Sequence, residues 1–492
     1  MITKIFGPPG TGKTTTLLDY VEKYINKGVP LSRIGYFAFT RKAANEAKQR
    51  MLKRKPSLNK KDLSYFQTLH SFAFHTLGLS EENIMQPVHY EQIGKDLNLR
   101  VLDSGDESGY LDFNSEYFKI INKARVKNIS VEEEFNSNEW SRDIDYETLG
   151  HVYINYNHFK KQSNLDDFND MIHKFTEQSN KCKEFDVIFI DEAQDLSPIQ
   201  WKMFDVLKTK AKDIYLAGDD DQAIFAWAGA DVNRFLNEPA TEVVLEQSAR
   251  VPLEVQNISN VILERISVRK EKKYLSKEGS KGAVYSIYNM DHLDLTKNKW
   301  LILTRTVYRS DEISKLLKQN NLYFENRFGR SYSNPLYKSI LKWGELCKGG
   351  EVSIADIKDI YNYLPDSFND KKFRNKSMLS MKDLDYSKDL IWYHAFTRAD
   401  QDECFYIRNL LAKGDKLSNE PRIEVSTIHA AKGGECQNVI LVLDNAKKIR
   451  DSVEHNVSKA DEEHRVWYVG VTRTEETLYL LKPKKERYGY SL

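Results

Sequence analysis

Residues 7–14 constrain this chain more than any other segment. They read Gly-Pro-Pro-Gly-Thr-Gly-Lys-Thr and directly follow the short apolar run Ile2–Phe6. This pattern is typical of a loop whose glycine-rich backbone closes its N–H groups around phosphates. Lys13 would reach the outer phosphates, the Thr14 hydroxyl would face Mg²⁺, and a helix beginning at Lys13 would point its positive end at the anion. The strand–loop–helix context favours nucleoside triphosphate binding over a merely structural turn.

The overall composition is compatible with such a protein and does not identify a partner. The 492 residues leave room for two to four domains. A net charge of +1 gives no global basic signal, so any nucleic-acid contact must use local patches or a channel. The four cysteines and eleven histidines lack metal-type spacing, so we expect reduced thiols and no structural metal. With no leader and no long apolar run, we expect a cytoplasmic protein without a membrane partner, compatible with a nucleoid or viral replication setting.

Strand and helix patterns alternate in two parts of the chain, which predicts an α/β fold with parallel sheets. The expected elements of the first part are strands at Ile2–Phe6, Ile34–Phe39, Val187–Ile190 and Ile214–Leu216, with helices at Lys13–Asn26 and Lys42–Lys53. Those of the second part are strands at Ala283–Ile287, Trp300–Leu303, around Val425, at Val439–Leu443 and at Thr477–Leu481, with a helix at Ser310–Asn320.

Polar, helix-leaning stretches interrupt both α/β cores. We therefore expect a first α/β domain at 1–78 and 183–250 with an accessory insertion at 79–182. A second α/β domain at 251–331 and 421–492 would carry a second insertion at 332–420.

Asp191 and Glu192 directly follow the apolar run Val187–Ile190. Catalytic groups in open α/β sheets lie just beyond the carboxyl ends of strands. Asp191 would hold Mg²⁺ through water, and Glu192 would orient and deprotonate the attacking water. An Asp-Glu pair alone usually belongs to a solvated loop. Because this one follows a buried strand in a chain with a phosphate loop, we interpret it as catalytic.

Gln222 ends the run Gly-Asp-Asp-Asp-Gln after the next apolar strand. An uncharged side chain that both donates and accepts suits a group that senses the γ-phosphate or positions water. Phe225 and Trp227 come immediately afterwards. By themselves, these two aromatic residues fit core packing and the stacking of unpaired bases equally well.

Two arginines could complete a phosphoryl-transfer site, because guanidinium groups stabilise the charge of the transition state. Arg250 ends the run Leu-Glu-Gln-Ser-Ala-Arg, and Arg473 lies near the far end of the chain. Any single arginine is more often a surface residue. If Arg473 touches the γ-phosphate, the nucleotide lies between the two α/β cores, and hydrolysis must change how they contact each other.

A series of segments resembles, in order, the motifs of superfamily 1 helicases of the UvrD/Rep type. The match runs from residue 5 to about residue 481 and covers both α/β cores, whereas the two insertions match by position only. The matching segments are Gly7–Thr14, Phe39–Ala44, Thr68–Phe72, Asp191–Asp195, Ala217–Gly229, Leu245–Arg250, Val425–Gly433 and Val469–Thr474.

The resemblance implies two RecA-like P-loop domains with ATP in their cleft and single-stranded DNA lying across both. The implied catalytic residues are Lys13, Asp191, Glu192, Gln222, Arg250 and Arg473, and the implied Mg²⁺ ligands are Thr14 and Asp191. The implied ATP-binding residues are Gly7, Pro8, Pro9, Gly10, Thr11, Gly12, Lys13, Thr14, Thr15 and Glu435, the last at the ribose. The implied DNA-binding residues are Phe39, Thr40, Thr68, His70, Phe225, Trp227 and His429. For Trp227 the resemblance favours base stacking, while His429 could instead be a satisfied interdomain histidine.

The chain departs from the family pattern at three places. No segment with an adenine-reading glutamine precedes the strand at Ile2, and Ala249 stands where the family usually has an adenine-stacking tyrosine. The usual Trp-Arg-Gly becomes Trp227-Ala228-Gly229. Because the first two departures remove adenine-specific contacts, we expect poor discrimination between ATP and GTP.

The second insertion looks shorter than in full-length family members. Its lysines and aromatic residues fit a duplex-DNA surface or a solvated helical face: Lys371, Lys372, Phe373, Trp392, Tyr393 and Phe396. We expect a reduced duplex-engaging domain, with translocation on single strands retained and weak unwinding of long duplexes.

The sequence thus predicts an ATP-dependent DNA helicase, an ATP hydrolase that translocates on single-stranded DNA, 3′→5′ by family analogy, and unwinds duplexes in DNA repair or replication. Its expected partners are single-stranded DNA and single-strand/duplex junctions, bound by a monomer or a weakly self-associating chain. One alternative is a translocase that displaces proteins or recombinase filaments with little unwinding. Another is a non-motor nucleotide switch, which would not need paired arginines and a stacking track.

Overall fold

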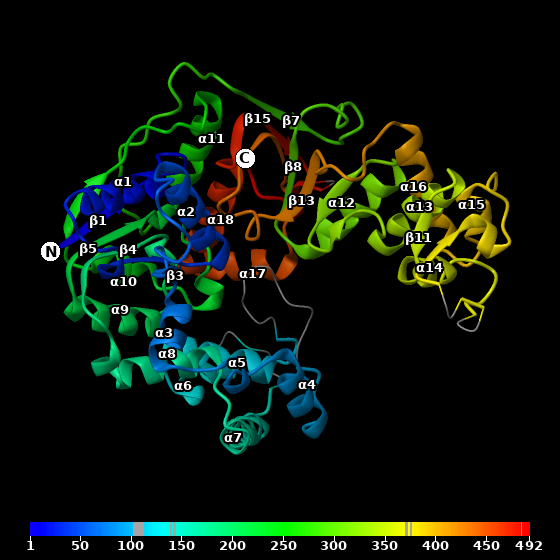
Figure 1. The fold of residues 1–492 in the computed structure, drawn as a ribbon. Coiled ribbons are helices and arrows are strands. Elements are labelled where there is room, and N and C mark those ends of the chain that lie inside the picture. The colour runs from blue at the N-terminus through cyan, green and yellow to red at the C-terminus, as the bar shows by residue number, and fades with distance from the viewer. Residues whose placement is uncertain (102–112, 138–139, 141–143, 370–371, 374–375, 484) are drawn as a thin grey trace.

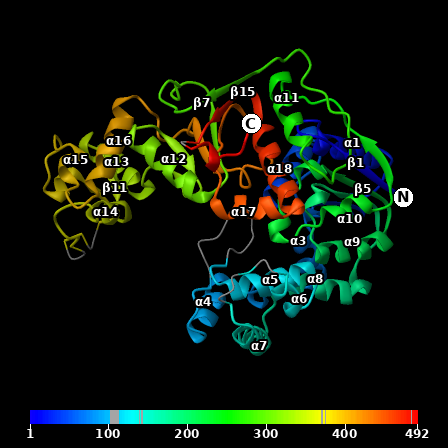
Figure 2. The same cartoon turned by 180° about the vertical axis from the view of Figure 1, so that it is seen from behind.

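The computed structural model describes residues 1–492 except 102–112, 138–139, 141–143, 370–371, 374–375 and 484. The described chain contains two α/β domains with mainly parallel sheets, which confirms the predicted fold class. Figure 1 shows a mainly helical lobe below the first domain and another extending sideways from the second. The view from behind shows the same arrangement, with the two helical lobes well separated (Figure 2).

In the described chain the first sheet has six strands, all parallel, in the spatial order β3-β2-β4-β5-β1-β6. They are β1 (Ile2–Phe6), β2 (Ile34–Ala38), β3 (Phe66–Thr68), β4 (Phe185–Ile190), β5 (Ala211–Gly218) and β6 (Thr241–Val244). The helices of this domain are α1 (Lys13–Asn26), α2 (Arg41–Arg54), α3 (Leu69–Leu77), α9 (Pro198–Lys210) and α10 (Val232–Asn237). All of β2 and all but one residue of β4 are buried, as expected where helices cover both faces of a parallel sheet.

Two features of its sequence position helix α1: the glycine at its N-cap and the apolar residues on its buried face. Gly12, at the N-cap, has a φ of +83°, a conformation that glycine adopts without steric cost. Leu17, Leu18 and Val21 are fully buried and lie on one side of the helix. The amide of Gly7 donates to a carbonyl at the end of β5, so the loop before α1 lies at the carboxyl edge of the sheet.

The second sheet has seven strands in the order β10-β9-β13-β8-β14-β15-β7, parallel except for the β9–β10 pair. They are β7 (Ala283–Ile287), β8 (Trp300–Thr304), β9 (Phe324–Asn326), β10 (Gly329–Arg330), β13 (Ile423–Thr427), β14 (Cys436–Val442) and β15 (Thr474–Leu481). The helices of this domain are α11 (Leu253–Leu263), α12 (Val307–Gln319), α17 (Lys447–His455) and α18 (Val457–Val471).

The first insertion leaves the first domain after α3 and returns at β4. It contains α4 (Pro87–Asp96), α5 (Glu116–Lys127), α6 (Val131–Phe135), α7 (Tyr146–Gln162) and α8 (Phe168–Glu177). The lobe has its own apolar core, whereas Ile172 and Phe175 of α8 belong to the core of the first domain. Helix α8 therefore anchors the insertion to the first sheet.

The second insertion lies between β10 and β13. It contains α13 (Asn334–Cys347), β11 (Glu351–Ser353), α14 (Ile354–Tyr361), β12 (Met378–Ser380), α15 (Trp392–Ala395) and α16 (Gln401–Ala412), with β11 and β12 antiparallel. Of the residues considered above for duplex DNA, Phe373 and Phe396 are buried in the core of this lobe and cannot form part of an exposed surface. Lys372 pairs with Asp385, and Lys371 lies outside the described residues.

The two α/β domains meet along α18. This helix packs against α11 and against the short turn η5 (Asp220–Gln222), which follows β5 of the first domain. The loop at residues 7–14 and the ends of β4 and β5 therefore lie close to the second domain. Among the described residues, no helix is both long and apolar enough to cross a membrane.

Candidate active site between the two domains

The glycine-rich loop folds tightly over its own lysine. Lys13 Nζ donates to the carbonyl of Gly7 at 2.7 Å, and a Cβ added at Gly7 would lie 2.3 Å from Lys13 Cγ. A Cβ at Gly10, which has a φ of +75°, would lie 2.5 Å from Arg250 Cβ. Both glycines are therefore required by close approach, and the loop passes directly over Arg250.

The remaining loop residues surround this turn. Pro8 and Pro9 are buried, the Thr11 hydroxyl donates to the Pro8 carbonyl, and Gly12 and Thr15 are exposed.

Asp191 lies at the end of β4, beside the start of α1. Its Oδ2 accepts hydrogen bonds from the hydroxyls of Thr14 and Tyr36, each at 2.8 Å. The carboxylate is buried, and burial together with the neighbouring Glu192 raises the pKa of Asp191. A buried carboxylate beside a threonine hydroxyl is an all-oxygen donor set of the kind that Mg²⁺ prefers, so these residues fit the ion.

Glu192 combines backbone strain with a strongly ionised carboxylate. Its φ is +55°, a region that costs a non-glycine residue about 1–2 kcal/mol. Burial alone would raise the pKa of Glu192, but the positive charges of Lys13 and Lys432 bring it down to about 2. Gln194 donates to Glu192 Oε2 at 2.6 Å and accepts from the Asp219 amide at 3.0 Å, so it links the ends of β4 and β5.

Gln222 and Arg473 join the two domains. Arg473, between α18 and β15 of the second domain, donates through Nη2 to Gln222 Oε1 at 3.0 Å. Its Nη1 donates to the carbonyl of Gly434, at 3.2 Å. Both side chains are buried. The residue that sequence reasoning assigned to γ-phosphate sensing is thus in direct contact with an arginine from the other domain.

Positive charge gathers next to the loop. Burial and the nearby Arg250 lower the pKa of Arg473 to about 9. Arg250 forms an ion pair with Glu435, and its buried Nε has no hydrogen-bond partner among the described residues. Two crowded guanidinium groups, one with an unused donor, form a site that favours an anion.

Lys432 also belongs to this site. It lies in the motif at Val425–Gly433, but no role was expected for it from the sequence. Its Nζ donates to Asp195 Oδ2 and to the backbone carbonyl of Gln222, the latter at 2.6 Å. Lys432 follows β13, so it adds a further second-domain contact to the ends of β4 and β5. The signal that could have identified it is its position in the Ala-Ala-Lys-Gly segment, three residues before Glu435.

Four of the residues expected to line DNA form one aromatic cluster. The rings of Phe39 and Phe225 are stacked, with their centroids 5.4 Å apart. The ring centroid of His429 lies 6.3 Å from that of Phe225 and 6.3 Å from that of Trp227. Phe225 is only 6% exposed and Trp227 is 48% exposed. The cluster combines segments after β2 and β5 of the first domain with one after β13 of the second. Within it, Trp227 is the ring that offers an open face.

The other three expected DNA residues lie elsewhere and have local structural contacts. The Thr40 and Thr68 hydroxyls cap α2 and α3 by accepting from the amides of Ala43 and Ser71. His70 packs edge-on against Phe168 of α8, at 5.7 Å. Burial and the charge of Arg41 lower the pKa of His70 to about 4, so it is neutral at physiological pH.

Ala249 also contacts the phosphate loop. Its amide donates to the Gly10 carbonyl at 2.9 Å, and its side chain is exposed. A different tyrosine, Tyr274 from the segment after α11, donates to the Pro9 carbonyl at 3.1 Å.

Comparison with known families agrees with this geometry. A model of the UvrD/REP helicase N-terminal domain matches residues 2–241, and a model of the UvrD-like helicase C-terminal domain matches residues 353–485. The chain belongs to the UvrD/REP helicase family. The resemblance predicted from the motifs is therefore confirmed. The nucleotide loop and Arg473 lie within the matched regions, whereas Arg250 lies between them.

Individual relatives are distant. A probable DNA helicase II homolog of Mycoplasma pneumoniae is 26% identical over 317 residues, which are 59% of this chain and 43% of the relative. A protein of the same name from Mycoplasma capricolum is 24% identical over 348 residues, 65% of this chain and 45% of the relative. The ATP-dependent DNA helicase PcrA of Staphylococcus aureus is 24% identical over 292 residues, 54% of this chain and 38% of the relative. The matched region spans less than half the length of these relatives.

Proposed function

We propose that this protein is an ATP-dependent DNA helicase that hydrolyses ATP between its two α/β domains and moves along single-stranded DNA. The observation that carries the proposal is the contact between Arg473 of the second domain and Gln222 of the first, 3.0 Å apart. A nucleotide held by the loop at residues 7–14 would then touch both domains. Its hydrolysis would change how they fit together.

The first domain would bind the triphosphate. Lys13 would leave the Gly7 carbonyl for the outer phosphates, and the N-terminus of α1 would face the anion. Thr14 and Asp191 would hold Mg²⁺, which when bound neutralises charge on the phosphate oxygens. Glu435, whose side chain is partly exposed beside Arg250, would contact the ribose.

Hydrolysis would need a base, a water-orienting group and stabilisation of the transition state. Glu192 stays ionised at neutral pH because Lys13 and Lys432 hold its pKa near 2, which favours orientation of the attacking water over strong basicity. Gln222 would contact either the same water molecule or the γ-phosphate. Arg250 and Arg473 would stabilise the charge that spreads over the equatorial oxygens.

Single-stranded DNA would lie along the aromatic cluster. The exposed face of Trp227 offers a stacking platform, while Phe39, Phe225 and His429 support it from both domains. Thr40, Thr68 and His70 would extend the track along α2 and α3. We propose 3′→5′ movement, by a monomer or a weakly self-associating chain, on single strands and at single-strand/duplex junctions inside the cell.

A translocase with little unwinding is the second candidate. The burial of Phe373 and Phe396 favours it, because these rings leave fewer aromatic contacts for a duplex on the second insertion. Weak preference for ATP over GTP also remains part of the proposal, since Ala249 offers no ring to an adenine. The two kcat/KM values test that point: comparable values support it, and a large ATP preference contradicts it.

Hydrolysis of ATP with and without single-stranded DNA tests the main proposal. The wild-type chain should be strongly stimulated, and Lys13→Ala should lose turnover while binding an oligonucleotide normally, because Lys13 Nζ donates to the Gly7 carbonyl of the loop and does not belong to the aromatic cluster. Oligonucleotides labelled at opposite ends would then report movement and its direction by stopped flow. Absence of DNA-stimulated hydrolysis would exclude a motor, and stimulation without strand separation would favour the translocase.

A further inference from the structure

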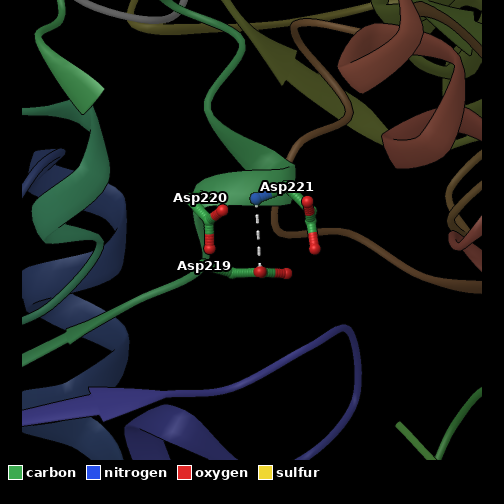
Figure 3. Close-up of side chains that lie close together, drawn as sticks. All are labelled: Asp219, Asp220 and Asp221. Atoms are coloured by element: carbon green, nitrogen blue, oxygen red, sulfur yellow. Dashed lines mark hydrogen bonds between the residues drawn. The ribbon is translucent and has the colours of Figure 1, made fainter. Parts of the chain in front are cut away.

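Three consecutive carboxylates are buried at the end of β5. Asp219, Asp220 and Asp221 are each at most 1% exposed and lie close together (Figure 3). One carboxylate oxygen from each lies within 4.8 Å of the other two. Like charges this close repel strongly in a poorly solvated interior, so the cluster requires a positive partner. The next residue in the chain is Gln222, the proposed sensor of the γ-phosphate.

The positive partner is Lys272. Its ammonium group lies 3.0 Å from Asp219 Oδ1 and 2.8 Å from Asp221 Oδ2, and it also pairs with Asp220. The side chain of Lys272 is itself only 1% exposed. Burial alone would lower the pKa of Lys272, but the three carboxylates raise it. Lys272 thus takes the place that a metal ion would have in such a group, and we assign no metal there.

Lys272 lies in the segment that connects α11 of the second domain to β7 of the second sheet. Arg269 of this segment donates from two nitrogens to the two oxygens of Asp221, at 2.8 and 2.7 Å. The amide of Lys270 donates to Asp220 Oδ2 at 2.7 Å. The segment is therefore held against the turn that contains Gln222.

Asp219 connects Lys272 to Gln222. Its Oδ1 receives the lysine, and its Oδ2 accepts from Gln222 Nε2 at 2.7 Å. An ionised carboxylate only accepts hydrogen bonds, so the amide nitrogen of Gln222 must face Asp219. The amide oxygen is thereby turned toward Arg473, which donates to it at 3.0 Å.

We propose that Lys272 is a positioning residue for the hydrolysis step, which holds the amide of Gln222 in its working orientation through Asp219. This inference rests on the proposed function, because it gives Lys272 a role only where Gln222 acts on the γ-phosphate. Lys272 itself contacts carboxylates of the protein and no part of the loop at residues 7–14 among its described contacts. It would therefore affect turnover rather than nucleotide affinity.

A double-mutant cycle between Lys272→Met and Gln222→Ala tests this role in the full chain. Lys272→Met should lower kcat of DNA-stimulated hydrolysis by about 10- to 100-fold, because a misplaced polar group costs that much in rate. KM for ATP and the Kd of a fluorescent ADP should change by less than about threefold. In the Gln222→Ala background, Lys272→Met should have no further effect on kcat; full multiplication of the two losses would overturn the proposal.

Arg269→Gln is the matched control. It removes an ion pair from the same segment but leaves the chain Lys272–Asp219–Gln222 intact, so it should lower the thermal midpoint while kcat stays within about threefold of wild type. Equal loss of kcat in Arg269→Gln and Lys272→Met would mean a merely structural role and would also overturn the proposal.

The cycle remains decisive if Lys272→Met does not fold. Asp219→Asn then replaces Lys272→Met in the cycle, because it keeps the side-chain volume and removes the charged acceptor. Its loss of kcat should likewise not multiply with that of Gln222→Ala. Wild-type protein that shows no DNA-stimulated hydrolysis would overturn the proposed function, and this inference with it. If the wild-type protein shows DNA-stimulated hydrolysis but the kcat losses of the two substitutions multiply fully, the positioning role alone would be overturned.

Discussion

At the level of single residues, the two arginines of the interdomain site crowd each other and are incompletely paired. Arg473 is buried with its pKa lowered to about 9, and Arg250 keeps a buried donor without a partner among the described residues. Such groups interact strongly with an incoming anion, because folding has already removed their charges from water and no further desolvation is needed when the anion binds. This explains how Arg473, at the far end of the sequence, could serve the loop at its beginning.

Trp227 offers a residue-level test of the DNA track. Trp227→Ala removes the exposed ring and leaves the buried Phe225 beneath it, so ATP hydrolysis should persist while strand separation falls by about tenfold or more. Tyr288→Ala, at an aromatic residue that is 83% exposed in the second domain, is the control and should change neither rate. Unwinding by Trp227→Ala at the wild-type rate would refute the assignment of this ring to DNA.

His429 makes a prediction about stability against pH. Burial, Arg305 and Lys432 lower the pKa of His429 to about 3, so the folded protein keeps this ring neutral. The unfolded chain binds a proton there near pH 6.5, and stability is lost below that pH, by up to about 1.4 kcal/mol for each pH unit. His429→Gln should therefore lose less thermal stability than wild type between about pH 7 and pH 5.

The control for this titration is His292→Gln, at an exposed histidine of the same domain, which should follow the wild type. Parallel pH curves for His429→Gln and wild type would show that His429 is protonated in the folded protein and would contradict the account.

Residues of this site could be predicted where the sequence pattern that marks them lies within a few positions of the residue itself. Lys13, Asp191 and Gln222 each follow an apolar strand, so their place at the carboxyl edge of a sheet could be predicted from a few neighbours. The contact of Lys272 with the three aspartates could not be predicted, because these partners lie some fifty residues earlier and nothing in its own segment distinguishes it from surface lysines.

At the level of elements, the first insertion rests on the turn that carries Trp227. Gly229, with a φ of +94°, lies under α5, and a Cβ added there would come within 2.5 Å of Val126 Cγ1. Helix α5 and the turn η6 (Ala226–Ala228) therefore fix each other. This close approach couples the position of the insertion to the proposed DNA track.

Gly229→Ala tests that coupling against Gly414→Ala. Both glycines have positive φ, so both substitutions cost about 1–2 kcal/mol of backbone strain. Gly414 has open space around it, whereas Gly229 has Val126. Gly229→Ala should therefore show the larger fall in thermal midpoint and weaker oligonucleotide binding. Equal midpoints and unchanged binding in both variants would argue against a coupled turn.

Long, strongly patterned elements could be predicted from the sequence, and short edge strands could not. The strands at Ile2–Phe6 and Ala283–Ile287 and the helix at Lys13–Asn26 have the predicted bounds. The strands β3 and β6 of the first sheet and β9 and β10 of the second were not predicted. These are two to four residues long, lie at or next to sheet edges, and depend on pairing with a neighbour rather than on their own pattern.

At the level of the whole molecule, the site exists only where the two domains meet. The first domain supplies Lys13, Asp191 and Gln222, and the second supplies Lys432 and Arg473. The motifs indicated that two cores should cooperate. How they pack along α18 could not be predicted, because that interface combines contacts from segments more than two hundred residues apart.

The rate of ATP hydrolysis by Arg473→Ala, in the presence of saturating single-stranded DNA, tests the joint site most directly. Arg309→Ala, at a second-domain arginine that pairs with Asp444 within its own domain, is the control. The account predicts that Arg473→Ala lowers kcat by about a hundredfold or more, while ADP affinity changes less than about threefold and Arg309→Ala behaves as wild type. A kcat for Arg473→Ala equal to that of wild type would show that the first domain hydrolyses ATP alone, and would contradict it.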